Sequence, residues 1–218
     1  WHNSPEFTFF YNKTLFKKLG LLPPTTYSTF RKACEKILNA GITPIYEYTS
    51  QGWHQVLAFA QIGGRYEELH PGLYEKLNNN QIKFTDVPAM LQALKQMKEI
   101  ADRGYYGKDF IANDGTKAAE LLATGKVAMT LTNPGFVKEI KKAHPECTYE
   151  WGLFLIPIID NQTYPFNPNG PARFAYKMGK NIDAVKKYFD FLTRKDNLQY
   201  RVDNHPEWTN VDVTTKIQ

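Results

Sequence analysis

The chain has 218 residues, of which 42% are hydrophobic, 14% aromatic and 22% charged, and this composition excludes intrinsic disorder as its main state. The formal net charge is +5, from 27 Lys and Arg against 22 Asp and Glu, and because these residues are spread evenly we expect no nucleic-acid partner. No apolar run approaches the roughly 18 residues that a membrane span requires.

Predicted helices and strands alternate through the first half of the chain. A helix is expected from a Thr26 cap to about Asn39, since its apolar side chains, Cys34 among them, recur at helical spacing. A strand at 42–48 follows it. A second helix is expected at 53–62 and should end at Gly63-Gly64, because glycine commonly terminates helices.

The alternation continues through the second half. The expected elements are a helix at 86–103 with Met90, Leu94, Met97 and Ala101 buried, a helix at 116–123, a strand at 127–131, a helix at 134–143, a strand at 150–156, a loop at 160–171, a strand at 173–178, and a helix from Asn181 with Val185, Tyr188, Phe189 and Leu192 facing inward. Alternating helices and strands predict an α/β layer architecture.

The sequence contains none of the common catalytic or metal-binding motifs. Gly125-Lys126 superficially resembles a phosphate-binding loop, but the earlier glycine and the following Ser or Thr of such a loop are replaced by Glu120 and Val127. The histidines are isolated, without zinc-like spacing, and the adjacent pair Glu67-Glu68 is better explained as solvated than as a general acid and base. We therefore expect no catalytic residue, metal or cofactor.

Aromatic and polar side chains gather where the strand at 42–48 meets the following helix. In open α/β sheets, ligands bind at the carboxyl ends of strands. Trp53 offers a flat apolar face on which a pyranose ring can stack, and Gln51 and His54 can hydrogen-bond the hydroxyl groups of the ring. The alternative, that Trp53 fills the core between helix and sheet, is equally compatible with these residues.

Two further segments have the same character. Asn133 and Phe136 lie where the strand at 127–131 ends and the next helix begins, although Asn133 is also a natural helix cap and Phe136 a natural core residue. The loop that contains Asn169 and leads to Arg173 is rich in proline and asparagine. It can present amide donors and acceptors at little entropic cost, or it can be an ordinary connection.

A series of short motifs along the chain resembles a known protein family. The motifs are Tyr11-Asn12-Lys13 with Leu19-Gly20-Leu21, Pro24-Thr25-Thr26-Tyr27, Gly63-Gly64, Thr124-Gly125-Lys126-Val127-Ala128-Met129, Trp151-Gly152 to Pro157, and Lys180-Asn181 to Phe191-Leu192-Thr193. In this order they resemble the extracellular solute-binding proteins of bacterial ABC importers, in the maltose-binding-protein-like branch that binds carbohydrates.

The resemblance bears on the candidate site. In that branch an aromatic residue in the loop before the "GG" helix stacks on sugar, and Trp53 falls at its position, with Gln51 at the position of a hydroxyl-binding carboxylate. A second stacking tryptophan of the family is missing here, and Phe136 is its nearest substitute. Asn169 to Arg173 match a crossing segment that often lines the cleft.

The resemblance also implies a fold and a function. The fold is a periplasmic-binding-protein-like lobe with a central mixed sheet flanked by helices, which forms half of a two-lobe clamshell closing by hinge motion. The implied function is capture of a sugar or oligosaccharide between the lobes and its delivery to ABC transporter permease subunits, without chemistry on the ligand. The implied protein is a monomer that is extracellular, periplasmic or anchored to the membrane as a lipoprotein.

Under this resemblance, the 218 residues correspond to about one lobe of a two-lobe protein. Residues 1–172 correspond to the second, C-terminal lobe, and 173–218 to a crossing strand and helices that return toward a largely absent first lobe. A complete protein of this kind has two such lobes. We therefore expect a fragment that binds its sugar weakly or not at all. No signal peptide is visible, and Cys34 and Cys147 fix no redox compartment.

Three other interpretations stay open. One is a solute-binding sensor for a signalling receptor. Another is a glycan-acting enzyme, which needs two carboxylates roughly 5 to 9.5 Å apart across its cleft. The last is an interaction protein whose aromatic residues all belong to the core.

Overall fold

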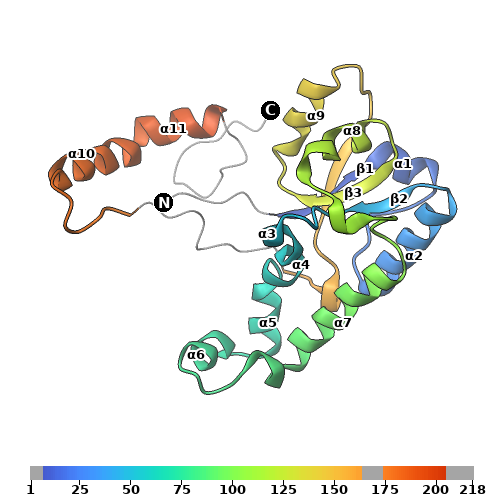
Figure 1. Ribbon diagram of the computed structural model, residues 1–218, viewed down its shortest axis with the longest axis horizontal. Coiled ribbons are helices and arrows are strands. Elements are labelled where there is room, and N and C mark those ends of the chain that lie inside the picture. The colour runs from blue at the N-terminus through green and yellow to red at the C-terminus, as the bar shows by residue number, and fades with distance from the viewer. Residues whose placement is uncertain (1–6, 164–173, 205–218) are drawn as a thin grey trace. The chain divides into compact units, whose positions relative to one another are not determined.

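A computed structural model describes residues 7–163 and 174–204. The chain divides into two compact units, Phe7–Phe166 and a second unit whose described part is residues 174–204. The first unit carries the sheet and most of the helices (Figure 1). Among the described residues, no helix has the length and apolar composition needed to cross a bilayer.

A mixed four-stranded sheet forms the centre of the first unit (Figure 1). Its strands are β1 (Thr8–Asn12), β2 (Thr43–Tyr46), β3 (Val127–Thr132) and β4 (Trp151–Phe154), in the order β2-β3-β1-β4. β2 and β3 are parallel, whereas β1 is antiparallel to both β3 and β4. The predicted mixed sheet flanked by helices is therefore confirmed.

Helices cover both faces of the sheet. On one face, Phe9 and Tyr11 of β1 pack in a core with α2 (Tyr27–Asn39) and α7 (Pro88–Asp102). On the other face, Phe10 packs with α8 (Ala118–Ala123) and α9 (Phe136–Ala143). Because it is covered on both faces, β1 is buried at every position and lacks the alternation that identifies a half-exposed strand. The sequence analysis assigned no strand there.

The remaining elements are mostly short. They are α1 (Lys13–Lys18), α3 (Gly52–Gln55), α4 (Leu57–Ala60), α5 (Gly63–Leu69), α6 (Leu73–Asn78), the 3-10 turns η1 (Phe84–Asp86), η2 (Phe110–Ala112), η3 (Gly115–Lys117) and η4 (Ile158–Asp160), and, in the second unit, α10 (Ile182–Thr193) and α11 (Lys195–Asn204).

The single helix predicted at 53–62 is wrong in its continuity and its end. It is broken at Val56 into α3 and α4. α4 ends at Ala60, and Gly63, which was expected to terminate the helix, begins α5. A Cβ atom at Gly63 would meet the hydroxyl of Tyr74 on α6, but Tyr74 is 44% exposed and its side chain can shift. Gly63 begins a helix where the sequence pattern predicts a helix end.

The apolar stripe predicted for α7 is partly wrong. Met90 is buried as expected, but Leu94 is 52% exposed and Ala93 is buried in its place. The buried residues Ala89, Ala93 and Ile100 show that the inward face is rotated relative to the prediction. Ala89 and Ala93 pack against the core on this face, whereas Leu94 faces solvent.

The described part of the second unit also departs from expectation. Residues 174–178 form no strand, so the strand predicted at 173–178 is wrong over the residues described. On α10, Val185, Phe189 and Leu192 are half-buried as predicted, whereas Tyr188 is 49% exposed.

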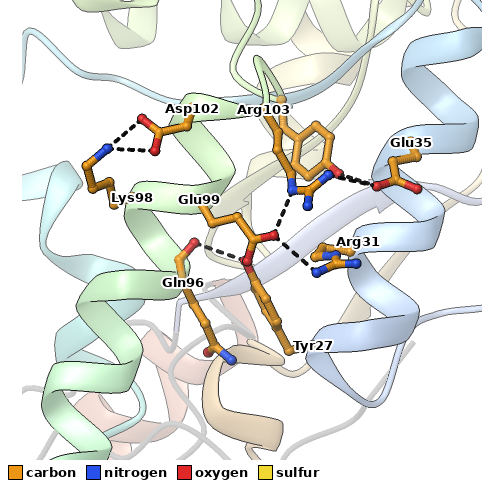
Figure 2. A network of polar contacts seen from close by, with 9 residues as sticks. Tyr27, Arg31, Glu35, Gln96, Lys98, Glu99, Asp102 and Arg103 are labelled. Atoms are coloured by element: carbon orange, nitrogen blue, oxygen red, sulfur yellow. Dashed lines mark hydrogen bonds and ion pairs between the residues drawn. The ribbon is translucent and has the colours of Figure 1, made fainter.

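A network of polar contacts joins α2 to α7 (Figure 2). The Tyr27 hydroxyl donates to Glu99 at 2.9 Å, and Arg31 and Arg103 bind the other Glu99 oxygen at 3.1 and 2.7 Å. Arg103 and the Tyr105 hydroxyl both reach Glu35, each at 3.2 Å. The Glu99 carboxylate on α7 therefore binds Tyr27 and Arg31 of α2 and so links the two helices.

Candidate functional site

The carboxyl ends of β2 and β3 meet at one edge of the sheet, because these parallel strands pair Tyr46 with Thr130. β1 begins at the same edge, where Thr8 pairs with Thr132. The chain that leaves β2 carries Trp53 on α3, the residue after β3 is Asn133, and Phe7 precedes β1 (Figure 1). The fold thus brings together the first two polar and aromatic segments that the sequence analysis selected. We call this region the β2–β3 edge.

Trp53 is the exposed aromatic residue of the β2–β3 edge. It is 53% exposed and stands on α3. Two rings hold it edge-on, Phe7 with its centroid at 5.9 Å and His54 at 5.2 Å. An indole that is supported on its sides and open to solvent is a platform for a flat apolar ligand surface, and its exposure does not fit a core plug.

His54 lies in the core beneath Trp53 and is only 1% exposed. Its Nδ1 atom is 2.5 Å from Oε1 of Glu47, and its Nε2 atom is 2.8 Å from the Leu131 carbonyl oxygen. Its ring stacks on Tyr48 at 4.0 Å. Both ring nitrogens are engaged, so the hydroxyl-binding role expected of His54 is not visible in this arrangement.

Gln51 occupies the N-cap position of α3 and is half-buried without a side-chain capping bond. Its amide nitrogen lies over Gly115, 3.6 Å from where a Cβ atom would stand. The adjacent loop is tied in by the amide and hydroxyl of Ser50, which donate to the Asn113 carbonyl oxygen at 2.9 and 2.8 Å. The loop that contains Asn113 and Gly115 therefore packs beside Gln51.

Two titratable side chains at this edge, Tyr48 and Asp114, have shifted pKa values. Burial raises the pKa of Tyr48 to about 12, so its hydroxyl stays protonated at neutral pH. Hydrogen bonds from the Thr116 hydroxyl and amide hold the pKa of Asp114 below its usual range. Asp114 is an ionised cap for its own turn.

Asn133 and Phe136 have local structural roles. The Asn133 side chain accepts a hydrogen bond of 2.9 Å from the Gly135 amide in the turn that precedes α9, and it is half-buried. Phe136 is 5% exposed and packs edge-on against Phe10 at 5.7 Å, in the core layer under α9. Asn133 stays at the β2–β3 edge, whereas Phe136 points into the core. Asn169 and Arg173 lie outside the described residues.

The sequence analysis missed Phe7, Glu47 and Asn113. Phe7 and Asn113 come from segments that no motif marked. Glu47 could have been found from the sequence. It is a carboxylate directly after an apolar strand and seven residues before His54, a spacing that allows a hydrogen bond between them across the turn.

The other candidate features lie elsewhere or carry no ligand set. In residues 7–163 and 174–204, no cluster of three or more His, Cys, Asp or Glu side chains could hold a metal ion. A surface hollow of about 370 Å³ is lined by Tyr11, Phe16, Leu22 and Glu150, among others. β1 ends and β4 begins beside it. The hollow therefore lies at the other end of the strands from the β2–β3 edge.

An α/β lobe whose parallel strands end at an exposed, supported tryptophan has the architecture of a ligand-binding domain. The family model of the bacterial extracellular solute-binding proteins matches residues 1–199, and the chain belongs to this family. The predicted family is therefore confirmed.

Individual relatives give the same picture. The sn-glycerol-3-phosphate-binding periplasmic protein UgpB of Escherichia coli K12 is 26% identical over 212 residues, covering 89% of this chain and 44% of its own. A Bacillus licheniformis sugar transporter structure in complex with stachyose has a TM-score of 0.66 at 19% identity, covering 89% of this chain and 51% of that one. RafE in complex with raffinose has a TM-score of 0.67 at 20% identity, covering 99% and 58%. The chain thus spans about half the length of the proteins it resembles.

Proposed function

We propose that the β2–β3 edge is one wall of a saccharide-binding cleft, and that the protein captures a sugar or oligosaccharide for import by an ABC transporter permease. The family supports solute binding outside the cytoplasm. Structures that share the fold are described with stachyose, raffinose and chitin oligosaccharide, which supports a carbohydrate ligand. Anchoring as a lipoprotein or residence in the periplasm, and action as a monomer, are parts of the same proposal.

The carrying observation is the Trp53 indole, 53% exposed between Phe7 and His54. The C–H face of a pyranose ring would stack on it, which removes apolar surface of both partners from water. Gln51 and Asn133 would supply amide donors and acceptors for the ring hydroxyls, and the Asn113 loop would bound the site. Asn169 and Arg173 stay predicted contacts from the crossing segment.

A polyol phosphate is the second candidate ligand, because UgpB is named for sn-glycerol-3-phosphate. A phosphate dianion favours Arg or Lys donors. The side chains that carry our proposal are aromatic and amide groups, which favours a neutral saccharide. Arg173 is the predicted site residue that would suit a phosphate.

Binding without chemistry is also part of the proposal. Glu47 and Asp114 lie at this edge, and both carboxylates are already committed, one to His54 and the other to Thr116. This supports a binding protein over a glycan-acting enzyme, which requires an available acid and base. A sensor for a signalling receptor would use the same saccharide site and differ only in its protein partner.

The Trp53→Ala variant tests the platform. Because the chain spans about half the length of its relatives, we expect it to bind raffinose and stachyose with dissociation constants of about 1 mM, measured by NMR titration. Loss of the stacking surface should weaken binding by about tenfold or more, since aromatic anchors dominate such sites.

Phe84→Ala is the matched control, because Phe84 is 62% exposed on η1, the turn before α7. It should bind like the wild type. Equal affinities for Trp53→Ala and the wild type would remove the platform from the proposal. If Trp53→Ala also unfolded the protein, the interpretation of Trp53 as a core residue would be favoured.

A further inference from the structure

A buried acid–histidine pair lies directly beneath Trp53. Glu47 is 8% exposed and His54 is 1% exposed, and a distance of 2.5 Å separates Nδ1 of His54 from Oε1 of Glu47. Glu47 directly follows β2, and His54 lies within α3 on the far side of the connecting turn. The pair therefore closes the loop that carries the candidate site.

The contacts of the His54 ring define where its hydrogens are. Nε2 faces the Leu131 carbonyl oxygen at 2.8 Å, and a carbonyl only accepts, so Nε2 carries a hydrogen. Nδ1 and the Glu47 carboxyl then share one proton, since a hydrogen bond at their separation requires it. The pair as a whole is neutral, and this suits its burial.

Packing transmits this arrangement to the indole. One face of the His54 ring stacks on Tyr48 with an interplanar angle of 29°, which leaves the ring little freedom to turn. The Trp53 indole meets the same ring at 76°, with centroids 5.2 Å apart. Rotation of the imidazole would therefore disturb the surface on which Trp53 rests.

We propose that Glu47 and His54 are positioning residues for ligand binding, because the proton that they share locks the imidazole and the imidazole fixes the orientation of the Trp53 indole. This inference rests on the proposed function, in which that indole is the stacking surface. It assigns to His54 an indirect role in place of the direct hydroxyl contact first expected of it.

The Glu47→Leu and Glu47→Gln variants separate positioning from simple support. A glutamine amide can donate to Nδ1 of a neutral His54 while Nε2 still donates to Leu131, so Glu47→Gln preserves both hydrogen bonds. Glu47→Leu leaves Nδ1 buried without a partner. The readouts are the 19F resonance of Trp53 in ligand-free protein labelled with 5-fluorotryptophan, assigned by its loss in Trp53→Phe, and the affinity for raffinose.

In Glu47→Leu, the Trp53 resonance should move toward its position in the unfolded protein, and raffinose affinity should fall by about fivefold, the cost of ordering one side chain on binding. Glu47→Gln should restore both readouts. If Glu47→Leu lowered only the melting temperature and left both readouts unchanged, or if Glu47→Gln failed to restore them, the proposal would be overturned. The ligand-free resonance does not depend on raffinose binding, so it tests positioning even if Trp53→Ala rejects the proposed function.

The chain offers a matched control in a second acid–histidine pair, His144 and Glu146, 3.1 Å apart on the surface. Glu146→Leu should leave the Trp53 resonance and the affinity unchanged, and a shift there would overturn the specificity of the effect. If Glu47→Leu does not fold, the double variant Glu47→Leu with His54→Phe removes both members of the pair at similar volume and leaves only the Leu131 carbonyl oxygen without its His54 donor. The same two readouts apply to it, and it should behave as Glu47→Leu is expected to.

Discussion

Gly152 illustrates how a single residue position can depend on the lack of a side chain. It lies in β4 opposite Tyr11 of β1, and a Cβ atom there would stand 2.6 Å from the Tyr11 ring and 2.9 Å from the Lys13 side chain. Tyr11 is 5% exposed and its ring packs against Phe16 and Phe154, with centroids 4.5 and 5.4 Å away, so the ring is held in place. The glycine is therefore required by packing across two strands.

We predict that Gly152→Ala lowers the free energy of unfolding by about 2 kcal/mol, because overpacking a rigid core costs this much. Urea unfolding measures the effect. Gly52→Ala is the control, since nothing lies within 4 Å of a Cβ at Gly52, the first residue of α3. A loss in Gly52→Ala equal to that in Gly152→Ala would contradict the packing explanation.

Residue types alone predicted only part of the site. Trp53 stays a predicted ligand contact, and its 53% exposure on α3, after the carboxyl end of β2, is compatible with a stacking platform. Whether a neighbouring polar side chain faces solvent or core depends on long-range contacts. His54 meets Leu131, 77 residues away, and Phe136 meets Phe10 across the sheet. Sequence spacing does not contain those contacts.

At the scale of elements, the network in Figure 2 carries the association of α2 with α7. Burial raises the pKa of Glu99, but hydrogen bonds from Arg103 and Tyr27 and the charge of Arg31 outweigh it, and the pKa is lowered from 4.5. A lowered pKa in the folded state means that the ionised carboxylate stabilises the fold above about pH 4.5, and that this stability is lost as the pH falls further.

We predict that Glu99→Ala costs about 2 kcal/mol of unfolding free energy at neutral pH, since it leaves partners on two helices unsatisfied. The difference from wild type should shrink as urea unfolding is repeated toward about pH 3. Asp102→Ala breaks an exposed pair with Lys98 on α7 alone and should cost at most about 0.5 kcal/mol. A pH-independent deficit in Glu99→Ala would contradict the charge-based explanation.

Elements with complete local signals were predicted well, and those fixed by tertiary packing were not. α2 has a capping box at Thr26 and a regular apolar period, and its predicted bounds agree closely with Tyr27–Asn39. β1 is apolar on both faces and has no period to read. The phase of α7 depends on which face meets the core, and small alanines on that face obscured it.

At the scale of the whole molecule, the order of short motifs predicted more than any single one. The family was identified correctly from motifs that are individually weak, because their order reflects the order of strands and loops in the lobe. The division at residue 172 stays a prediction, as do the permease partner and the sugar itself. The chain covers 44% of UgpB and 58% of RafE, so the cleft and its second wall also stay parts of the proposal.

The most direct test of the central claim is to map where a saccharide touches this lobe. Backbone and indole NMR shifts should be recorded while raffinose, stachyose and, separately, sn-glycerol-3-phosphate are added to the 218-residue chain. We predict saccharide-dependent shifts centred on Trp53, Gln51 and Asn133, with sn-glycerol-3-phosphate causing smaller ones. Shifts centred on the hollow beside Leu22 and Glu150, or no shifts at about 10 mM saccharide, would contradict the assignment of the β2–β3 edge as the binding wall.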